Sequence, residues 1–86
     1  MKDMMKKLIR RKLLALDTEV LVRHKVKDFG DSYMDHDDFY NVIEIKENEL
    51  VGSSCVDGST LSFGFDQVLK VDGMTPKRLC DAFKIK

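Results

Sequence analysis

The segment from Asp28 to Asp38 holds the side chains with the clearest capacity for chemistry. Its five Asp and one His offer ligands of the kind that divalent cations bind. The spacing departs from the calcium-loop pattern, because no Gly follows Asp35-His36-Asp37 at the required step and no Glu closes the segment. We therefore predict no metal site here, and we interpret residues 28–37 as a long, solvated loop between two strands.

The same loop mixes apolar side chains with its carboxylates. Protein interfaces commonly combine aromatic or Met anchors with a charged rim, so the loop is a candidate docking surface. The predicted partner-binding residues are Phe29, Asp31, Tyr33, Met34 and Asp35.

Two His and two Cys are the remaining residues that could bind zinc or supply a nucleophile. No two of them show the close spacing that makes a zinc site predictable, and His24 falls on the apolar side of an alternating stretch. Cys55 and Cys80 fit the role of small core residues. The run from Gly52 to Cys55 lacks the phosphate-loop pattern and is interpreted as a bend in a strand. We therefore predict neither enzymatic activity nor a cofactor.

The charges are balanced overall but divided along the chain. Fifteen Lys and Arg stand against fifteen Asp and Glu; residues 1–27 carry nine basic and three acidic side chains, and residues 28–49 carry one and eight. This dipolar pattern argues against a uniformly basic nucleic-acid binder and suits a charged partner or self-association. The apolar runs are too short for a membrane span or a signal peptide, and two Cys do not suggest a disulfide framework. We expect a soluble, cytoplasmic protein.

Periodicity predicts a single domain over residues 1–86, with a helix at each end and five strands between them. Residues 1–16 are predicted as a basic amphipathic helix. Its apolar stripe consists of Met4, Met5, Leu8, Ile9 and Leu16. Alternation and β-branched content predict strands near residues 18–27, 38–46, 49–56, 59–65 and 68–71. Asp57-Gly58 suggests a type I′ hairpin turn, and Thr75-Pro76 begins a helix over 75–84.

The order of the loops resembles that of the Src-homology-3-like small barrels. After the long first loop come a tight turn at Glu47-Asn48, a hairpin at Asp57-Gly58 and a one-turn connector at Asp66-Gln67. The resemblance covers about residues 18–72 and implies a mainly β, five-stranded barrel with flanking helices. Peptide-binding members of that group use a Trp in their groove, and this chain has none.

The run Asp37-Asp38-Phe39-Tyr40-Asn41 is similar to the first motif of the Sm-like RNA-binding proteins, which also place a helix before a bent five-stranded sheet. The resemblance implies an Asp and an Asn in an RNA pocket. The apolar residue expected after this run is replaced by Glu44, and the Arg-Gly pair of the second motif is missing near residues 65–68.

We predict a non-enzymatic interaction or regulatory module that binds a protein partner, encoded by a phage or mobile element, where small single-domain regulators are frequent. A nucleic-acid binder is the alternative, with a basic surface made of Lys6, Lys7, Arg10, Arg11, Arg23 and Lys25. The apolar stripe of the N-terminal helix is wide for a helix that covers only a small barrel, which predicts a homodimer through that helix.

Overall fold

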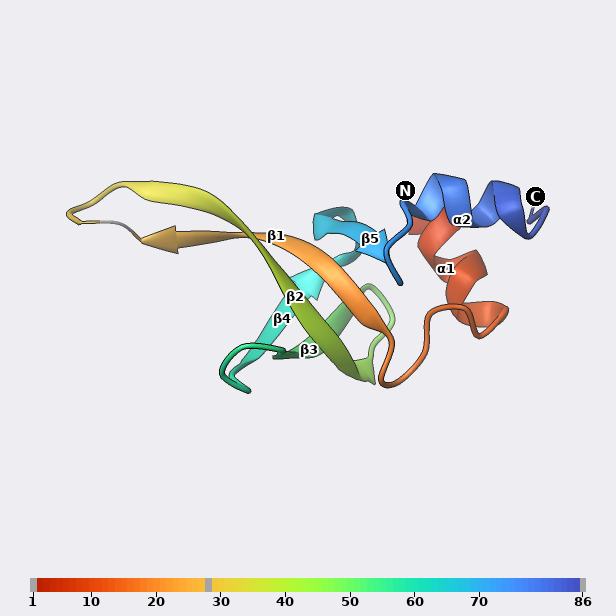
Figure 1. Cartoon of the computed structure of the whole chain (residues 1–86), viewed down its shortest axis with the longest axis horizontal. Helices are drawn as coiled ribbons and strands as arrows, with labels where there is room; N and C mark the ends of the chain where they lie inside the picture. Colours follow the sequence, from red (N-terminus) through yellow and green to blue (C-terminus); the bar gives the residue numbers. More distant parts are fainter. Residues whose placement is uncertain (1, 28, 86) are drawn as a thin grey trace.

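A five-stranded antiparallel sheet forms most of the structure, with two short helices at one end (Figure 1). The structure is a computed structural model that describes residues 2–27 and 29–85. In chain order the elements are α1 (Lys2–Arg10), β1 (Glu19–Lys27), β2 (Tyr33–Ile45), β3 (Glu49–Ser54), β4 (Thr60–Gly64), the 3-10 turn η1 (Phe65–Gln67), β5 (Val68–Val71) and α2 (Pro76–Ala82). The predicted mainly β class is confirmed. No helix in this described part is long and apolar enough to cross a membrane.

The strands are arranged in the order β4-β3-β2-β1-β5, so β4 and β5 lie at opposite edges of the sheet. A barrel closes when its edge strands pair, and β4 and β5 form no ladder in the described residues. The predicted closed barrel is therefore not observed, and the sheet is open. Two irregularities bend it: β2 carries one extra residue between Val42 and Glu44, and β5 carries one opposite Leu21 and Val22.

One apolar core joins the sheet to both helices. α1 packs against α2 and η1, and α2 also packs against β5. Burying a large apolar side chain contributes about 1.5–3 kcal/mol to the free energy of unfolding. The buried residues are Met5, Leu8, Leu14, Val20, Val22, Tyr40, Val42, Leu50, Phe63, Phe65, Val68, Val71, Leu79 and Cys80. All of them lie outside residues 23–39, so the core is confined to one part of the molecule.

α1 ends at Arg10, six residues before the predicted end. Lys12 adopts a left-handed conformation with φ of 60°. The Lys12 amide donates to the Ile9 carbonyl, and the Leu13 amide donates to the Leu8 carbonyl, both at 3.0 Å. These two bonds form a Schellman motif, which satisfies the last carbonyls of a helix. The helix therefore stops where the backbone reverses at Lys12.

The apolar stripe predicted for the first helix is used inside the chain. Met5 and Leu8 are fully buried. Leu14 interrupts the predicted stripe, yet it also enters the core because the chain turns inward after the Schellman motif. Leu16, which was expected on the stripe, is 59% exposed. The width of the stripe consequently no longer argues for a homodimer through this helix.

α2 begins as its sequence predicts. The Thr75 hydroxyl accepts a hydrogen bond from a first-turn backbone amide at 3.2 Å, and Pro76 is the first helical residue. The other end repeats the motif of α1: Lys84 is left-handed, with φ of 55°, and the Ile85 amide donates to the Cys80 carbonyl at 2.9 Å.

Half of the segment predicted as a long loop, residues 28–37, is strand. β2 begins at Tyr33, and its first residues pair with β1 down to the Lys27–Tyr33 pair. Residues 29–32 precede β2 without regular structure, and Asp28 lies outside the described residues. The side chains of residues 33–37 are all exposed, so this stretch shows none of the apolar-polar alternation by which strands are recognised.

The turn predicted at Asp57-Gly58 also differs in type. Gly58 has a positive φ of 76°, but Asp57 does not, and a type I′ turn requires both. Two consecutive left-handed residues occur instead at Asp72-Gly73, where Val71 and Met74 exchange backbone hydrogen bonds of 2.7 and 3.0 Å. The tight turn at Glu47-Asn48 is confirmed by the bond from the Lys46 amide to the Glu49 carbonyl at 2.9 Å.

Candidate functional site

β1 and β2 extend beyond the rest of the sheet as a two-stranded hairpin (Figure 1). We call this part the arm and define it as residues 23–27 and 29–38. β5 pairs with β1 only as far as Val22, and β3 pairs with β2 only as far as Tyr40. Within the described residues, the two strands of the arm therefore pair only with each other. The arm makes the molecule elongated, at 45 Å by 22 Å by 20 Å.

The tip of the arm carries all five residues predicted to bind a partner. Phe29 is fully exposed, and Tyr33 and Met34 are 63% and 52% exposed. Asp31 and Asp35 are exposed beside them. The structure thus brings the predicted residues to one end of the molecule, on a hairpin rather than on an irregular loop.

Strand alternation divides the tip into two faces. Tyr33 and Asp35 lie on one face, where Asp35 stands directly across from Lys25. Met34 lies on the other face, directly across from Val26. Val26 is absent from the predicted site residues, although it ends the alternating run of β1 and is 37% exposed. Each face of the tip therefore presents at least one apolar side chain to solvent.

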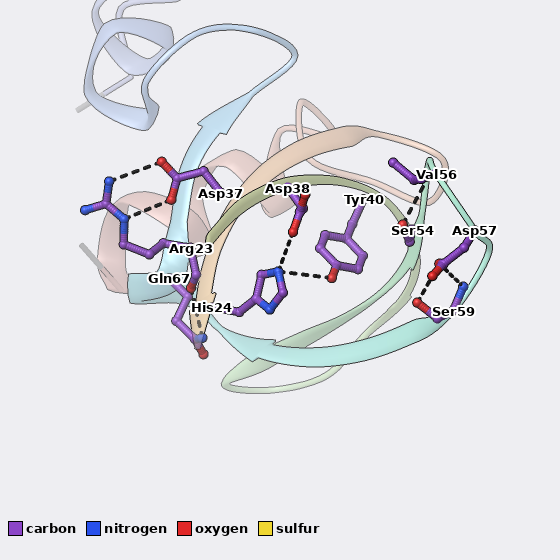
Figure 2. Close-up of polar contacts among 10 residues, drawn as sticks. All are labelled: Arg23, His24, Asp37, Asp38, Tyr40, Ser54, Val56, Asp57, Ser59 and Gln67. Atoms are coloured by element: carbon purple, nitrogen blue, oxygen red, sulfur yellow. Dashed lines mark hydrogen bonds and ion pairs between the residues drawn. The ribbon is translucent and has the colours of Figure 1, made fainter. Parts of the chain in front are cut away.

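A forked ion pair holds the charged face of the arm. The Arg23 guanidinium donates from Nε to Asp37 Oδ1 at 2.9 Å and from Nη2 to Oδ2 at 3.2 Å (Figure 2). The hydrogen bonds from Arg23 hold the pKa of the Asp37 carboxyl below its ordinary value, and the same carboxylate raises the pKa of Arg23. Arg23, one of the residues predicted to bind phosphate, is therefore already engaged within the arm.

A polar cluster lies on the opposite face, where the arm meets the core. His24 Nε2 lies 2.7 Å from Asp38 Oδ2 and 3.5 Å from the Tyr40 hydroxyl (Figure 2). The His24 ring meets the Tyr40 ring edge-on, with centroids 5.8 Å apart. Burial raises the pKa of the Tyr40 phenol above its ordinary value, and the charge of Asp38 adds to the shift. The cluster ties the base of the arm to the core.

The other candidate ligands and nucleophiles are not brought together. Among residues 2–27 and 29–85, no three His, Cys, Asp or Glu side chains are grouped so that they could hold a metal ion. His36 lies across from His24 on the arm, Cys55 is exposed after β3, and Cys80 is buried in α2. A two-His, two-Cys arrangement is therefore not formed by the described residues.

The basic residues predicted to bind nucleic acid fall into two groups. One group lies on α1 and directly after it, and the other lies on β1 at the base of the arm. The helical group consists of Lys6, Arg10 and Arg11, which are exposed, and Lys7, which is half-buried; the arm group is Arg23 and Lys25.

Comparisons with protein-family models, with curated proteins and with solved structures found no match to this chain.

Proposed function

We propose that this chain is a non-enzymatic interaction module that binds a protein partner through the tip of the arm. The observation that carries the proposal is the exposure of Phe29, Tyr33 and Met34 on a hairpin that the core does not reach. Removing apolar surface from water is favourable by about 25 cal/mol of free energy per Å², so these side chains favour a partner that covers them. Asp31 and Asp35 supply a charged rim that orients such a partner.

The free edges of the arm add a second means of binding protein. Along residues 33–37, β2 pairs with β1 on one side only, so alternate backbone amides and carbonyls face outward. An extended peptide can add to such an edge by main-chain hydrogen bonds, while its side chains contact Tyr33 or Met34. A partner that supplies a strand therefore fits both the edge and the exposed apolar side chains.

The open sheet, in our proposal, is a variant of the Src-homology-3-like or Sm-like architecture. The long first hairpin, the tight turn between β2 and β3, and the one-turn connector η1 between β4 and β5 support this assignment. Such folds host many functions, so the architecture itself implies no activity. A regulatory role, a phage or mobile-element origin and a cytoplasmic location complete the proposal; the two free Cys agree with a reducing compartment.

A photo-crosslinking experiment tests the arm as the binding element. The photoreactive residue p-benzoylphenylalanine replaces Phe29 in one variant and Val56 in a matched control, since Val56 is 87% exposed on the turn between β3 and β4. We expect one discrete protein adduct from position 29 and none from position 56, and the double variant Tyr33→Ser, Met34→Ser should abolish the adduct. Equal adducts from both positions, or none from position 29, would contradict the proposal.

A nucleic-acid binder is the second candidate, favoured by one observation. α2 packs beside α1 and adds Lys77 and Arg78 to the basic residues of the first helix, and Lys84 follows α2. Binding to phosphates releases counterions, so the affinity for an oligonucleotide should fall steeply as salt rises. Replacing Arg10 and Arg11 by Ala should then reduce the salt slope by about one for each phosphate that the variant no longer neutralises. Fluorescence anisotropy that detects no binding at low salt would eliminate this candidate.

A further inference from the structure

The two helices collect basic side chains from both ends of the sequence. We call residues 3–14 and 76–85 the helical end; it lies opposite the arm (Figure 1). Residues 3–14 carry five Lys or Arg and one Asp, and residues 76–85 carry three and one. Residues 15–27 and 29–75 together carry seven more acidic than basic side chains. The helical end is thus the positive pole of a molecule whose other described parts are negative.

A hollow of about 230 Å³ opens on the helical end. It is lined by Arg11, Leu13, Phe83 and Ile85. These residues come from the two Schellman motifs: Arg11 and Phe83 directly follow α1 and α2, and Leu13 and Ile85 donate the motif's backbone bonds. Phe83 is 55% exposed, so the hollow has an apolar floor that its own chain does not cover. Arg11 adds a positive charge to this lining.

The tip of the arm has the complementary chemistry. Phe29 offers a fully exposed aromatic ring, and Asp31 follows it by two residues. An aromatic anchor beside a carboxylate fits an apolar floor beside a guanidinium. A phosphate backbone would match the charge of Arg11 but would leave Leu13 and Phe83 uncovered. The combination of apolar floor and positive charge therefore favours an acidic protein segment over a polyanion.

We propose that the hollow is the docking site for the arm tip of a second copy of this chain. Phe29 of one protomer inserts between Leu13 and Phe83 of its partner, and Asp31 pairs with Arg11. Because tip and hollow lie at opposite ends of an elongated molecule, two copies side by side and antiparallel form both contacts at once. This arrangement closes as a two-fold dimer. The inference rests on the proposed function of the arm and names its partner.

Sedimentation equilibrium of the full chain, from about 10 μM to about 1 mM, tests the dimer. The tip variant is Phe29→Ser and the hollow variant is Arg11→Glu; matched controls at exposed positions elsewhere are Val56→Ser and Lys70→Glu. We expect a dimer for the wild type and the controls, and association at least about tenfold weaker for each of the other two variants. Raising the salt concentration should also weaken the wild-type dimer, because surface charges are screened.

Mixing the two variants provides the decisive measurement. The tip variant keeps an intact hollow, and the hollow variant keeps an intact tip, so an equimolar mixture can form one of the two contacts. We expect dimers in the mixture at concentrations where each variant alone is monomeric. Circular dichroism of each variant confirms that the chain is folded. A mixture that associates no more strongly than either variant alone, while the wild type is a dimer, would overturn the assignment of the hollow, because the interface would then lie elsewhere.

Other outcomes separate this inference from the proposed function. A wild type that is monomeric at every concentration overturns the dimer, and if position 29 still crosslinks to another protein, the arm keeps its proposed role. A wild type that grows beyond a dimer overturns the two-fold arrangement. If the wild type is a monomer that binds an oligonucleotide and the Arg11→Glu variant does not bind it, the helical end is a phosphate-binding surface instead.

Discussion

Lys12 and Lys84 occupy the left-handed positions that end the two helices. A side chain with a Cβ atom is disfavoured there by about 1–2 kcal/mol, which is why Gly is the usual residue and the usual signal in a sequence. Neither position carries that signal, so a helical wheel continues α1 through Lys12 as far as Leu16. The end of α1 was therefore not predictable from the residue types around it.

Replacing either lysine by Gly should stabilise the protein. Lys12→Gly and Lys84→Gly each remove the left-handed penalty, and the extra chain entropy of Gly offsets part of the gain. We expect each variant to raise the free energy of unfolding by about 0.5–1 kcal/mol, measured by urea denaturation. Lys6→Gly, inside α1, is the control and should lower it by about 1 kcal/mol. A loss of stability in both Schellman variants would contradict the assigned backbone conformation.

Gly52 is required for space rather than for a special backbone angle. A Cβ atom at this position would lie 2.7 Å from the Tyr40 Cβ and 2.9 Å from a ring carbon of Phe63. Gly52→Ala should therefore lower the free energy of unfolding by about 1–3 kcal/mol, because the packed rings must move. Ser62→Ala, on the exposed side of β4, should change it by less than about 0.5 kcal/mol. Equal effects of the two substitutions in a urea titration would show that Gly52 is not crowded.

Tyr40 should set an alkaline limit to stability. Burial raises the pKa of its phenol above the ordinary value of 10.0, since the folded state disfavours the phenolate. The contribution of Tyr40 to the free energy of unfolding is fully present below the pKa of Tyr40 in the unfolded chain. It is lost as the pH rises through the higher pKa of Tyr40 in the folded state. Urea midpoints between about pH 8 and about pH 11 should fall in the wild type and fall less in Tyr40→Phe. Tyr33→Phe, at an exposed position, should behave like the wild type; a Tyr40→Phe profile identical to the wild type would refute this cause.

Elements with a buried face were predictable, and those without one were not. The strands β3, β4 and β5 and the helix α2 place apolar residues against the core, so their periodicity or caps appear in the sequence. The first half of β2, from Tyr33 to Asp37, has no buried face, so its pattern predicts a loop. Composition correctly predicts that these residues are exposed. The place of Val26 beside Met34 on the arm was not predictable, because the neighbour of Val26 across the hairpin depends on the strand register. The open edge of the sheet likewise follows from strand pairing, which a single sequence does not show.

The arm should open independently of the sheet that supports it. Residues from Tyr33 to Asp37 pair with β1 but are backed by no core residue, whereas β2 contributes buried side chains at Tyr40 and Val42. Hydrogen exchange should therefore be faster over residues 33–37 than over residues 40–45, although both belong to β2. Uniform protection along β2 would mean that the hairpin unfolds only with the whole molecule.

Across the whole molecule, the core and the arm tip that is proposed to bind are separate. The core residues lie in the sheet and the helices, outside residues 23–39, and the exposed apolar tip lies beyond them. The basic helices lie at one end of the long axis, and the arm, with four acidic and three basic side chains among its described residues, lies at the other (Figure 1). A surface change at either end should therefore leave the core intact.

Shortening the arm tests this separation directly. Residues 26–34 are replaced by Asn-Gly, a two-residue turn that joins Lys25 to Asp35, which stand opposite each other in the ladder. The change removes Phe29, Tyr33 and Met34 but no core residue, so the free energy of unfolding should change by less than about 1 kcal/mol. The shortened chain should unfold cooperatively in urea but should not bind the partner. An exchange of the tip sequence for Ser and Gly at constant length, used as the control, should abolish binding in the same way. Absence of the cooperative transition would show instead that the arm contributes to the fold, and retained binding would place the interaction surface elsewhere.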